Sequence, residues 1–414
     1  MREPDKSAIR LSGTNLERAA DHNQRITLHA IRVRGTTTRV ELARLTGLTA
    51  PAIANITKRL IADDLVHEAG QVRQGRGQPA IKLKLNSNAC FSIGVNIDRD
   101  HIAIAIVNFV GETVVRRVSE IDFALPTDVR DFYLKSIAEM VDHAKIDVHR
   151  LVGVGVATPD DLGSIELAGR PPQYAEWDDT DMAGLFSAPY NLPVFIENDA
   201  AAAAMGEQQL GSGHDHDSAF YILISWGLGG GFFADGNYVR GVSGRSGEIG
   251  FLNCRGSDGT NEQIQQWVSL SGLSKHLEAN GENLSRLFAS DHSEQFEKLV
   301  DSWIDIAVVR LLDAMIAINC LLNPAAVLLG GRLPEKFLVR LKSRLNVYLA
   351  EHARHIPSLA PVKLADLAED APTVGAAILP FSHYLLPKAA TLWKPPSGGP
   401  DDGDESNGSW MQRN

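Results

Sequence analysis

The chain has 414 residues, of which 44% are hydrophobic and 22% are charged, and its formal net charge is -11. This length suits two or three domains, and the composition is that of a globular protein rather than a disordered or fibrous one. No apolar leader begins the sequence and no uninterrupted apolar run could span a bilayer, so we expect neither a secretory signal nor a membrane association.

The cysteines bear on the compartment. Cys90, Cys254 and Cys320 lie far apart in the sequence and form no CxxC pair. This spacing argues against a disulfide framework and favours a reducing environment. We therefore expect a cytoplasmic protein.

The net charge conceals an asymmetry along the chain. Residues 1–86 contain 15 Lys and Arg against 8 Asp and Glu, a balance of +7, whereas the remainder contains 25 against 43, a balance of -18. A basic head on an acidic body indicates that only the head meets a polyanion. Charge alone leaves a merely solvated basic surface equally open.

The basic head contains two short helices with a tight turn between them. Thr38 predicts a helix start, and Gly47 permits a sharp turn. A second helix begins near Thr49 and tolerates Pro51 in its first turn. The apolar residues expected to face the core are Val40, Leu42, Ala43, Leu45, Ile53, Ile56 and Leu60. This pattern predicts a helix-turn-helix.

The outward face of the second helix suits DNA. Its residues are small, polar or basic, and with the helix cap they are Thr49, Ala52, Asn55, Lys58 and Arg59. Such groups read base edges and phosphates in the major groove. A helical hairpin without a DNA-binding function is the alternative.

A hairpin with a basic, glycine-rich tip follows the second helix. The sequence LVHEAGQVRQGRGQPAIKLKLN predicts a wing. We expect Arg76, flanked by Gly77 and Gln78, to enter a minor groove. Because a twofold DNA operator requires paired heads, we also expect a homodimer or a dimer of dimers.

The body contains an internal duplication. FSIGVNIDRDHIAIAIVNFVGETV and AFYILISWGLGGGFFADGNYVRG both read as strand, turn, strand and glycine turn, and each is followed later by a helix and a further strand. Two such halves predict an α/β fold of two lobes with a cleft between them, where small ligands bind.

Two stretches of the body offer chemistry for a ligand. VFIENDAAAAAMGE places Asn198 and Asp199 where a strand meets a helix, and their amide and carboxylate suit sugar hydroxyls. GRSGEIGF places Glu248 between glycines, where the backbone approaches a ligand closely. An ordinary helix cap is the alternative for the first stretch.

These motifs resemble the ROK family, which unites sugar kinases with sugar-responsive transcriptional repressors. The resemblance covers about residues 20 to 388 and rests on GLTAPAIANI, GRGQP, IENDAAAAAMGE, GLGGGFFADGNYVRG, SGEIG, NPAAVLLGG and APTVGAAIL. It implies two actin-like lobes of the ribonuclease-H type, preceded by a winged helix-turn-helix domain. Family kinases lack this domain, so its presence implies the repressor branch, of the xylose or N-acetylglucosamine type.

The resemblance also implies a domain organisation. We expect the DNA-binding domain over 21–86 and the sugar-binding domain over 88–388. Composition adds two expectations: a flexible N-terminus over the polar residues 1–20 and a disordered tail over the Pro-, Gly- and Asp-rich residues 391–414. The effector would be a monosaccharide or a sugar derivative, and the regulated genes would serve carbohydrate metabolism or uptake.

Site roles follow from matching positions in the family. Asp199 matches the catalytic base of the kinases, Asn198 a residue that hydrogen-bonds the sugar, and Glu248 a sugar-contacting glutamate. Gln265 matches a second sugar-contacting glutamate. Thr158 lies in the turn that closes over the sugar, where kinases have Pro-Gly and this chain has Pro-Asp.

The expected nucleotide site departs from the kinase pattern. Where family kinases carry an Asp-x-Gly-Gly-Thr turn, this chain has Asn96 in place of the first acid and Asp98 in place of a glycine. The first change removes a partner of magnesium. The second places a carboxylate about 4 Å from a phosphate oxygen, at a cost of roughly 1 to 4 kcal/mol. Trp226 and Leu228 add bulk, so we expect a degenerate site, no catalytic residue and no cofactor.

Two other functions stay open. One is a sugar kinase with an accessory DNA-binding head, which the carboxylate of Asp98 disfavours. The other is a regulator whose body docks a transport protein. The combination of Asn198, Asp199 and Glu248 favours a sugar over a docked protein.

Family members typically hold a structural zinc with one histidine and three cysteines. The matching positions in this chain are Phe251, Gly256, Asp258 and Gln263. With Cys254 as the only thiol nearby, these residues cannot supply a tetrahedral Cys₃His site. We therefore expect no bound metal, and we expect apolar packing of Phe251 to hold the loop.

Overall fold

The computed structural model describes residues 16–72, 79–121, 123–159, 162, 171–242, 244–255, 261–353 and 355–387. The predicted wing tip, with Arg76, Gly77 and Gln78, lies outside these residues, as does the expected tail at 391–414. None of the helices described within these ranges has both the length and the apolar character needed to cross a bilayer.

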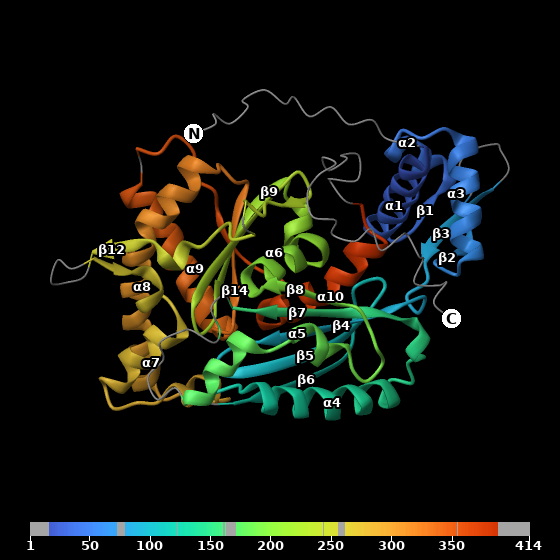
Figure 1. Ribbon diagram of the computed structural model, residues 1–414. Coiled ribbons are helices and arrows are strands. Elements are labelled where there is room, and N and C mark those ends of the chain that lie inside the picture. Colours follow the sequence, from blue (N-terminus) through green and yellow to red (C-terminus); the bar gives the residue numbers. More distant parts are fainter. Residues whose placement is uncertain are drawn as a thin grey trace, which may run out of the picture.

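The N-terminal part combines three helices with a three-stranded antiparallel sheet (Figure 1). The helices are α1 (Leu16–Arg34), α2 (Arg39–Thr46) and α3 (Ala50–Ala62). The strands, in sheet order, are β1 (Thr37–Thr38), β3 (Ala80–Leu85) and β2 (Val66–Val72). Helix α1 begins within the segment 1–20 that we expected to be flexible. Its buried Leu28 and Ile31 fix it to the core, and each added residue extends an existing helix at little cost.

Local hydrogen bonds define the two helices that the sequence predicts. The N–H of Glu41 donates to Thr38 Oγ1 at 3.3 Å, and the N–H of Thr38 donates to Glu41 Oε2 at 2.8 Å, which makes a capping box at the start of α2. Gly47 ends α2 with a φ of 69°, and Thr49 caps α3. The predicted pair of helices and the glycine turn are confirmed.

The predicted burial on α2 is only partly correct. Leu42 is fully buried, but Val40 and Leu45 are 72% and 41% exposed. The helix has only two turns, and α1 and α3 cover one side of it. Apolar residues on the other side therefore face solvent.

The body contains two five-stranded sheets with the same strand order. The first sheet runs β6 (Thr113–Glu120), β5 (His101–Asn108), β4 (Phe91–Ile97), β7 (Leu151–Thr158), β8 (Val194–Asn198). The second runs β11 (Asn237–Tyr238), β10 (Leu228–Ala234), β9 (Ser218–Ile224), β14 (Ala326–Gly331), β15 (Val362–Leu364). In both sheets the central strand pairs antiparallel on one side and parallel on the other. The predicted duplication is confirmed.

Helices complete each lobe. The first sheet carries α4 (Pro126–His143) and α5 (Met182–Ser187). The second forms its core with α7 (Leu270–Glu278), α8 (Glu294–Leu321) and α9 (Glu335–His352). A small hairpin of β12 (Asn253–Arg255) and β13 (Asn261–Gln263) projects beside α8. We call the first sheet with its helices the first lobe, and the second sheet with its helices and this hairpin the second lobe.

Two helices lie between the lobes. Figure 1 shows α6 (Asp199–Leu210) and α10 (Ala371–Tyr384) side by side at the centre of the molecule. Helix α10 packs on β4 and β7 of the first sheet, whereas α6 packs on β10 of the second. A Cβ atom on Gly375 of α10 would lie 1.8 Å from the carbonyl oxygen of Ala202 of α6. The backbones of α6 and α10 are therefore in direct contact.

One apolar cluster joins the N-terminal part to the body. It contains Leu28 and Ile31 of α1 together with Phe381 of α10 and Leu385 beyond it. The boundary expected near residues 86–88 thus separates two stretches of sequence that share a core.

Candidate functional site

The predicted sugar residues of the first lobe lie at the ends of neighbouring strands. Thr158 ends β7 and Asn198 ends β8, and the two are paired in register. Asn198 Oδ1 accepts a hydrogen bond from the N–H of Ala201 at 3.1 Å, so Asn198 caps α6. Asp199, the first residue of α6, accepts one from the N–H of Ala200 at 2.7 Å. Because the cap engages Oδ1, the amide nitrogen is the group that Asn198 offers to other partners.

The predicted sugar residues of the second lobe, Glu248 and Gln265, belong to two short 3-10 segments that contact each other. Glu248 precedes a short 3-10 helix that packs against β10. A Cβ atom on Gly250 of that helix would lie 3.3 Å from Gln265 Oε1. Gly229 lies in β10, and a Cβ atom on it would lie 2.7 Å from the Cβ of Ala200 at the start of α6. The fold therefore brings the segments of Glu248 and Gln265 near the start of α6.

An arginine that sequence reasoning missed lies beside this group. Arg99, in the turn between β4 and β5, is only 8% exposed. A Cβ atom on Gly227, in the turn between β9 and β10, would lie 3.4 Å from Arg99 Nη1 and 3.7 Å from Gln265 Oε1. The turns where the resemblance places the nucleotide phosphates thus meet each other, with a guanidinium between them.

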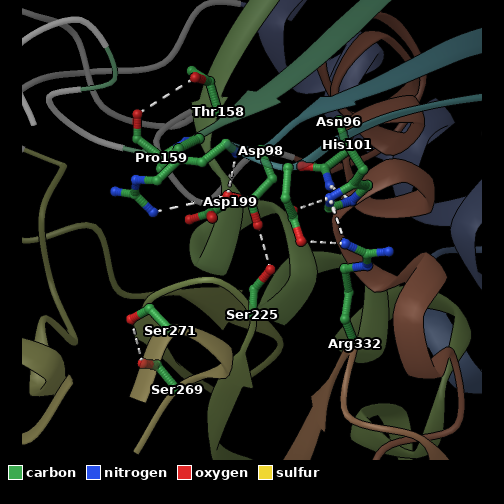
Figure 2. A network of polar contacts seen from close by, with 12 residues as sticks. Asn96, Asp98, His101, Thr158, Pro159, Asp199, Ser225, Ser269, Ser271 and Arg332 are labelled. Carbon is green, nitrogen blue, oxygen red and sulfur yellow. Dashed lines mark hydrogen bonds and ion pairs between the residues drawn. The ribbon is translucent and has the colours of Figure 1, made fainter. Parts of the chain in front are cut away.

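Asp98 joins the two lobes through a charged hydrogen bond. Its carboxylate accepts one hydrogen bond from the Ser225 hydroxyl of the second lobe and another from the N–H of Arg99 at 2.7 Å (Figure 2). Burial by itself would raise the pKa of Asp98. The charges of His101 and Arg99 and the two hydrogen bonds outweigh burial and hold this pKa below its ordinary value. Asp98 is therefore ionised at neutral pH.

Arg332 joins the lobes a second time. It follows β14 in the second lobe, is 7% exposed, and donates from Nη1 to Asp100 Oδ2 at 2.6 Å and from Nη2 to Glu120 Oε1 at 2.7 Å. Burial would lower the pKa of Arg332, but the two carboxylates of the first lobe raise it. We call this set of residues the inter-lobe clasp: Asp98, Asp100, Glu120, Ser225 and Arg332.

Two residues of the clasp and the adjacent His101 form a group with the composition of a metal site. Asp98, Asp100 and His101 bring ligand atoms within 4.8 Å of one another. However, Arg332 Nη1 bonds to Asp100 and lies 3.2 Å from His101 Nδ1. A guanidinium thus already supplies the positive charge that these acids require, and the residues fit an ion-pair network better than a divalent metal.

Asn96 and Leu228 are two further residues by which the region matched to the nucleotide site of the kinases departs from the kinase pattern. Asn96 is 3% exposed, its Nδ2 lies 3.2 Å from His101 Nε2, and its Oδ1 has no hydrogen-bond partner among the described residues. Leu228, expected to obstruct a nucleotide, is instead buried in the core of the second lobe. That expectation was wrong, because Leu228 begins β10 on the face of the sheet that packs on the core.

The loop expected to replace a zinc site is held differently from the prediction. Phe251 is 50% exposed, so its expected apolar packing was wrong. Cys254 and Ile264 are buried in the second-lobe core instead, and Gln263 lies in β13, which pairs with β12. Two other matching positions, 256 and 258, lie outside the described residues. The absence of a bound zinc stays a prediction.

The predicted DNA-contacting residues of α3 share one surface. Thr49, Asn55, Lys58 and Arg59 are exposed, and Ala52 is half-buried. The inward face of the same helix carries buried residues: Ile53, Thr57 and Leu60. The structure thus separates a packing face from a polar, basic face, as the spacing predicts.

The clasp makes a testable contribution to stability. Arg332→Leu removes two charged hydrogen bonds and leaves Asp100 beside buried Asp98 without its cation. We expect this change to lower the free energy of unfolding by about 2 kcal/mol, because charged hydrogen bonds contribute roughly 1.5–3 kcal/mol. Urea denaturation measures the loss. Arg117→Leu removes a half-buried arginine that pairs with Glu139 within the first lobe and serves as the matched control. Equal losses in the two variants would contradict a special role for the clasp.

Comparison with known proteins matches residues 92–382 to the ROK family. The xylose repressor of Bacillus subtilis strain 168 is 24% identical over 375 residues, covering 88% of this chain and 96% of the repressor. A glucokinase of Halalkalibacterium halodurans is 26% identical over 326 residues, covering 69% of this chain and 94% of the glucokinase.

Solved structures share the fold. A ROK family transcriptional regulator, a homolog of the E. coli MLC protein, superposes with a TM-score of 0.61 at 22% identity, covering 88% of this chain and 96% of the regulator. A ROK family glucokinase from Streptomyces griseus, in complex with glucose and AMPPNP, gives a TM-score of 0.51 at 22% identity, covering 70% and 98%. Because the family match spans most of the sequence, this chain belongs to the ROK family.

Proposed function

We propose that this protein is a sugar-responsive transcriptional regulator, acting as a repressor of genes for carbohydrate metabolism or uptake. The observation that carries the proposal is the extent of similarity. The xylose repressor and the ROK regulator each match 88% of the chain, whereas the two glucokinases match 69–70%. The family domain at 92–382 cannot account for the larger share, so the additional similarity falls mainly on the basic N-terminal part.

The N-terminal part has the form that this function requires. Two helices joined by the turn at Gly47 precede the β2–β3 hairpin, in the order of a winged helix-turn-helix. Helix α3 presents Thr49, Ala52, Asn55, Lys58 and Arg59 to duplex DNA, and Arg76, Gly77 and Gln78 belong to the proposed wing. A twofold operator would be bound by a homodimer or a dimer of dimers in the cytoplasm.

The body would bind a monosaccharide or a sugar derivative without phosphorylating it. We assign sugar binding to Thr158, Asn198, Asp199, Glu248 and Gln265. The clasp supports the absence of kinase activity, because Asp98 bonds to Ser225 between the two turns where a nucleoside triphosphate would have to enter. Arg332, which follows β14, bonds to Asp100 of the first of these turns. A sugar kinase with an accessory head is the second candidate, supported by similarity to ROK glucokinases.

An Asp199→Asn variant tests the effector site. This change removes a carboxylate acceptor and keeps the side-chain shape, so we expect affinity for the responsive sugar to fall at least tenfold while sugar-free DNA affinity stays within twofold. Calorimetry with a panel of D-xylose, D-glucose and N-acetyl-D-glucosamine measures the first quantity. Fluorescence anisotropy with a duplex selected from a random library by the wild-type protein measures the second.

Other outcomes would contradict the proposal in distinct ways. Unchanged sugar affinity in both Asp199→Asn and Glu248→Gln would place the effector elsewhere. Transfer of phosphate from ATP to any sugar of the panel by the wild type would favour the kinase. Failure of the wild type to select any duplex would remove the transcriptional role.

A further inference from the structure

We propose that α6 and α10 act as one rigid unit that couples the sugar site to the DNA-binding part, with Arg32 and Arg25 of α1 as the residues that receive the signal. The inference rests on the proposed function and names the elements of its regulation. Three observations carry it: the start of α6 in the candidate sugar site, the contact between α6 and α10, and the bonds that the far ends of both helices make to α1.

The first end of α6 lies in the candidate sugar site. Asn198 caps the helix and Asp199 is its first residue. A ligand that draws on either side chain must therefore act on the helix start itself. Loss or rearrangement of the cap bond to Ala201 would shift the first turn of α6.

The contact between the two helices leaves no room for independent movement. Gly375 of α10 lies against the backbone of Ala202, and a Cβ atom on Gly206 would lie 3.0 Å from backbone atoms of Gly375. No side chain separates the helices at this crossing, so no rotamer change can absorb a displacement. Because packed interiors transmit strain, a shift of α6 moves α10 as well.

The far ends of both helices bond to the same helix of the N-terminal part. Arg32 Nη1 of α1 donates to Gln209 Oε1 of α6 at 2.8 Å. Arg25 Nη1 of α1 donates to the carbonyl oxygens of His383 and Leu386, at the end of α10 and beyond it, at 2.9 and 3.2 Å. A displacement of either α6 or α10 would therefore act directly on a hydrogen bond to α1.

The contact at Arg32 is suited to exchange between two states. Burial lowers the pKa of Arg32 to about 10, and burial together with the Arg32 charge lowers the pKa of the neighbouring His29 to about 4. Arg32 Nη2 has no hydrogen-bond partner among the described residues. The partner of Arg32 Nη1, Gln209, is neutral. A half-buried cation whose bonded partner is neutral is weakly compensated. Arg25, in contrast, also bonds to Asp21 at 2.8 Å. The Arg32 contact is thus the weaker and more easily shifted of the two.

Hydrogen exchange with DNA alone tests the coupling without any knowledge of the sugar. In the wild type, binding of the selected duplex is expected to change amide exchange in residues 199–206 of α6 at least threefold. In Gln209→Ala and in Arg32→Met the change is expected to fall below 1.5-fold although the duplex still binds. Arg34→Gln, which removes an exposed arginine from the same helix, is the control and should behave as the wild type. A wild type whose α6 exchange does not respond to bound DNA overturns the proposal.

A sugar measurement tests the same coupling in the other direction. D-xylose, or whichever sugar of the panel the wild type binds, is expected to change its DNA affinity at least tenfold, within the 5- to 150-fold range of typical couplings. In Gln209→Ala and Arg32→Met this factor should fall below two, while the affinity for sugar alone and for DNA alone stays within twofold of the wild type. Variants that retain the wild-type factor overturn the proposed coupling through α6 and α10 but leave the proposed function as a regulator intact. A wild type that binds no duplex contradicts the proposed function instead.

Discussion

Duplex DNA is expected to bind the Lys58→Ala, Arg59→Ala double variant about 100-fold more weakly than it binds the wild type. Both side chains are exposed on α3, outside its packing face. Loss of one good base or phosphate contact costs roughly 1–3 kcal/mol, so the loss of two accounts for a factor of this size. Fluorescence anisotropy at one fixed salt concentration measures the affinity. The salt dependence should also become shallower, because fewer phosphates are neutralised.

The matched control removes a basic residue from the body. Lys298 lies on α8, where it pairs with Glu294, and the body as a whole is acidic. We expect Lys298→Ala to bind DNA as the wild type does. If this variant lost as much affinity as the double variant, binding would reflect general attraction between charges, and α3 would have no special role.

A Gly375→Ala variant is expected to lose at least about 3 kcal/mol in the free energy of unfolding. The added Cβ would lie 1.8 Å from the carbonyl oxygen of Ala202, and this atom belongs to a helix backbone that no rotamer change can move away. Overpacking of this kind costs roughly 1–3 kcal/mol and occasionally more, and here the two helices themselves must separate. Urea denaturation followed by circular dichroism measures the change.

Gly227→Ala, in the turn between β9 and β10, provides a control glycine substitution. Its Cβ would meet its nearest atoms at 3.4 and 3.7 Å, which are ordinary contact distances, and these atoms are the ends of flexible side chains. We expect a change below about 1 kcal/mol, as for most substitutions that create no strain. Equal stability of the two variants would show that α6 and α10 are not packed as closely as the structure indicates.

Several features of this protein follow from short stretches of sequence. Thr38, Glu41, Gly47 and Thr49 define two helices and a turn through hydrogen bonds and backbone conformations that span four residues or fewer. The repeated strand pattern likewise identifies two halves, and the two sheets do share one strand order. The family motifs identify the ROK family, which comparison confirms.

Burial was harder to predict than secondary structure. Val40, Leu45 and Phe251 are apolar yet exposed, whereas Cys254 is buried. Hydrophobic periodicity shows which residues are able to face a core, but it does not show on which side a neighbouring element lies. Burial of an individual side chain therefore depends on packing between elements.

The sequence by itself determined α2 and α3 of the N-terminal part, the duplicated halves of the body and the strand end that bears Asn198 and Asp199. Only the tertiary structure decided the pairing of distant groups. Arg332 meets Asp100 across 232 positions, and Arg32 meets Gln209 across 177. Patterns within a short stretch of sequence do not predict such pairs. The physical reason is that the geometry of these pairs depends on how the two lobes and α1 are held together. That arrangement depends in turn on the close contact between α6 and α10, which is possible because Gly375 has no Cβ atom.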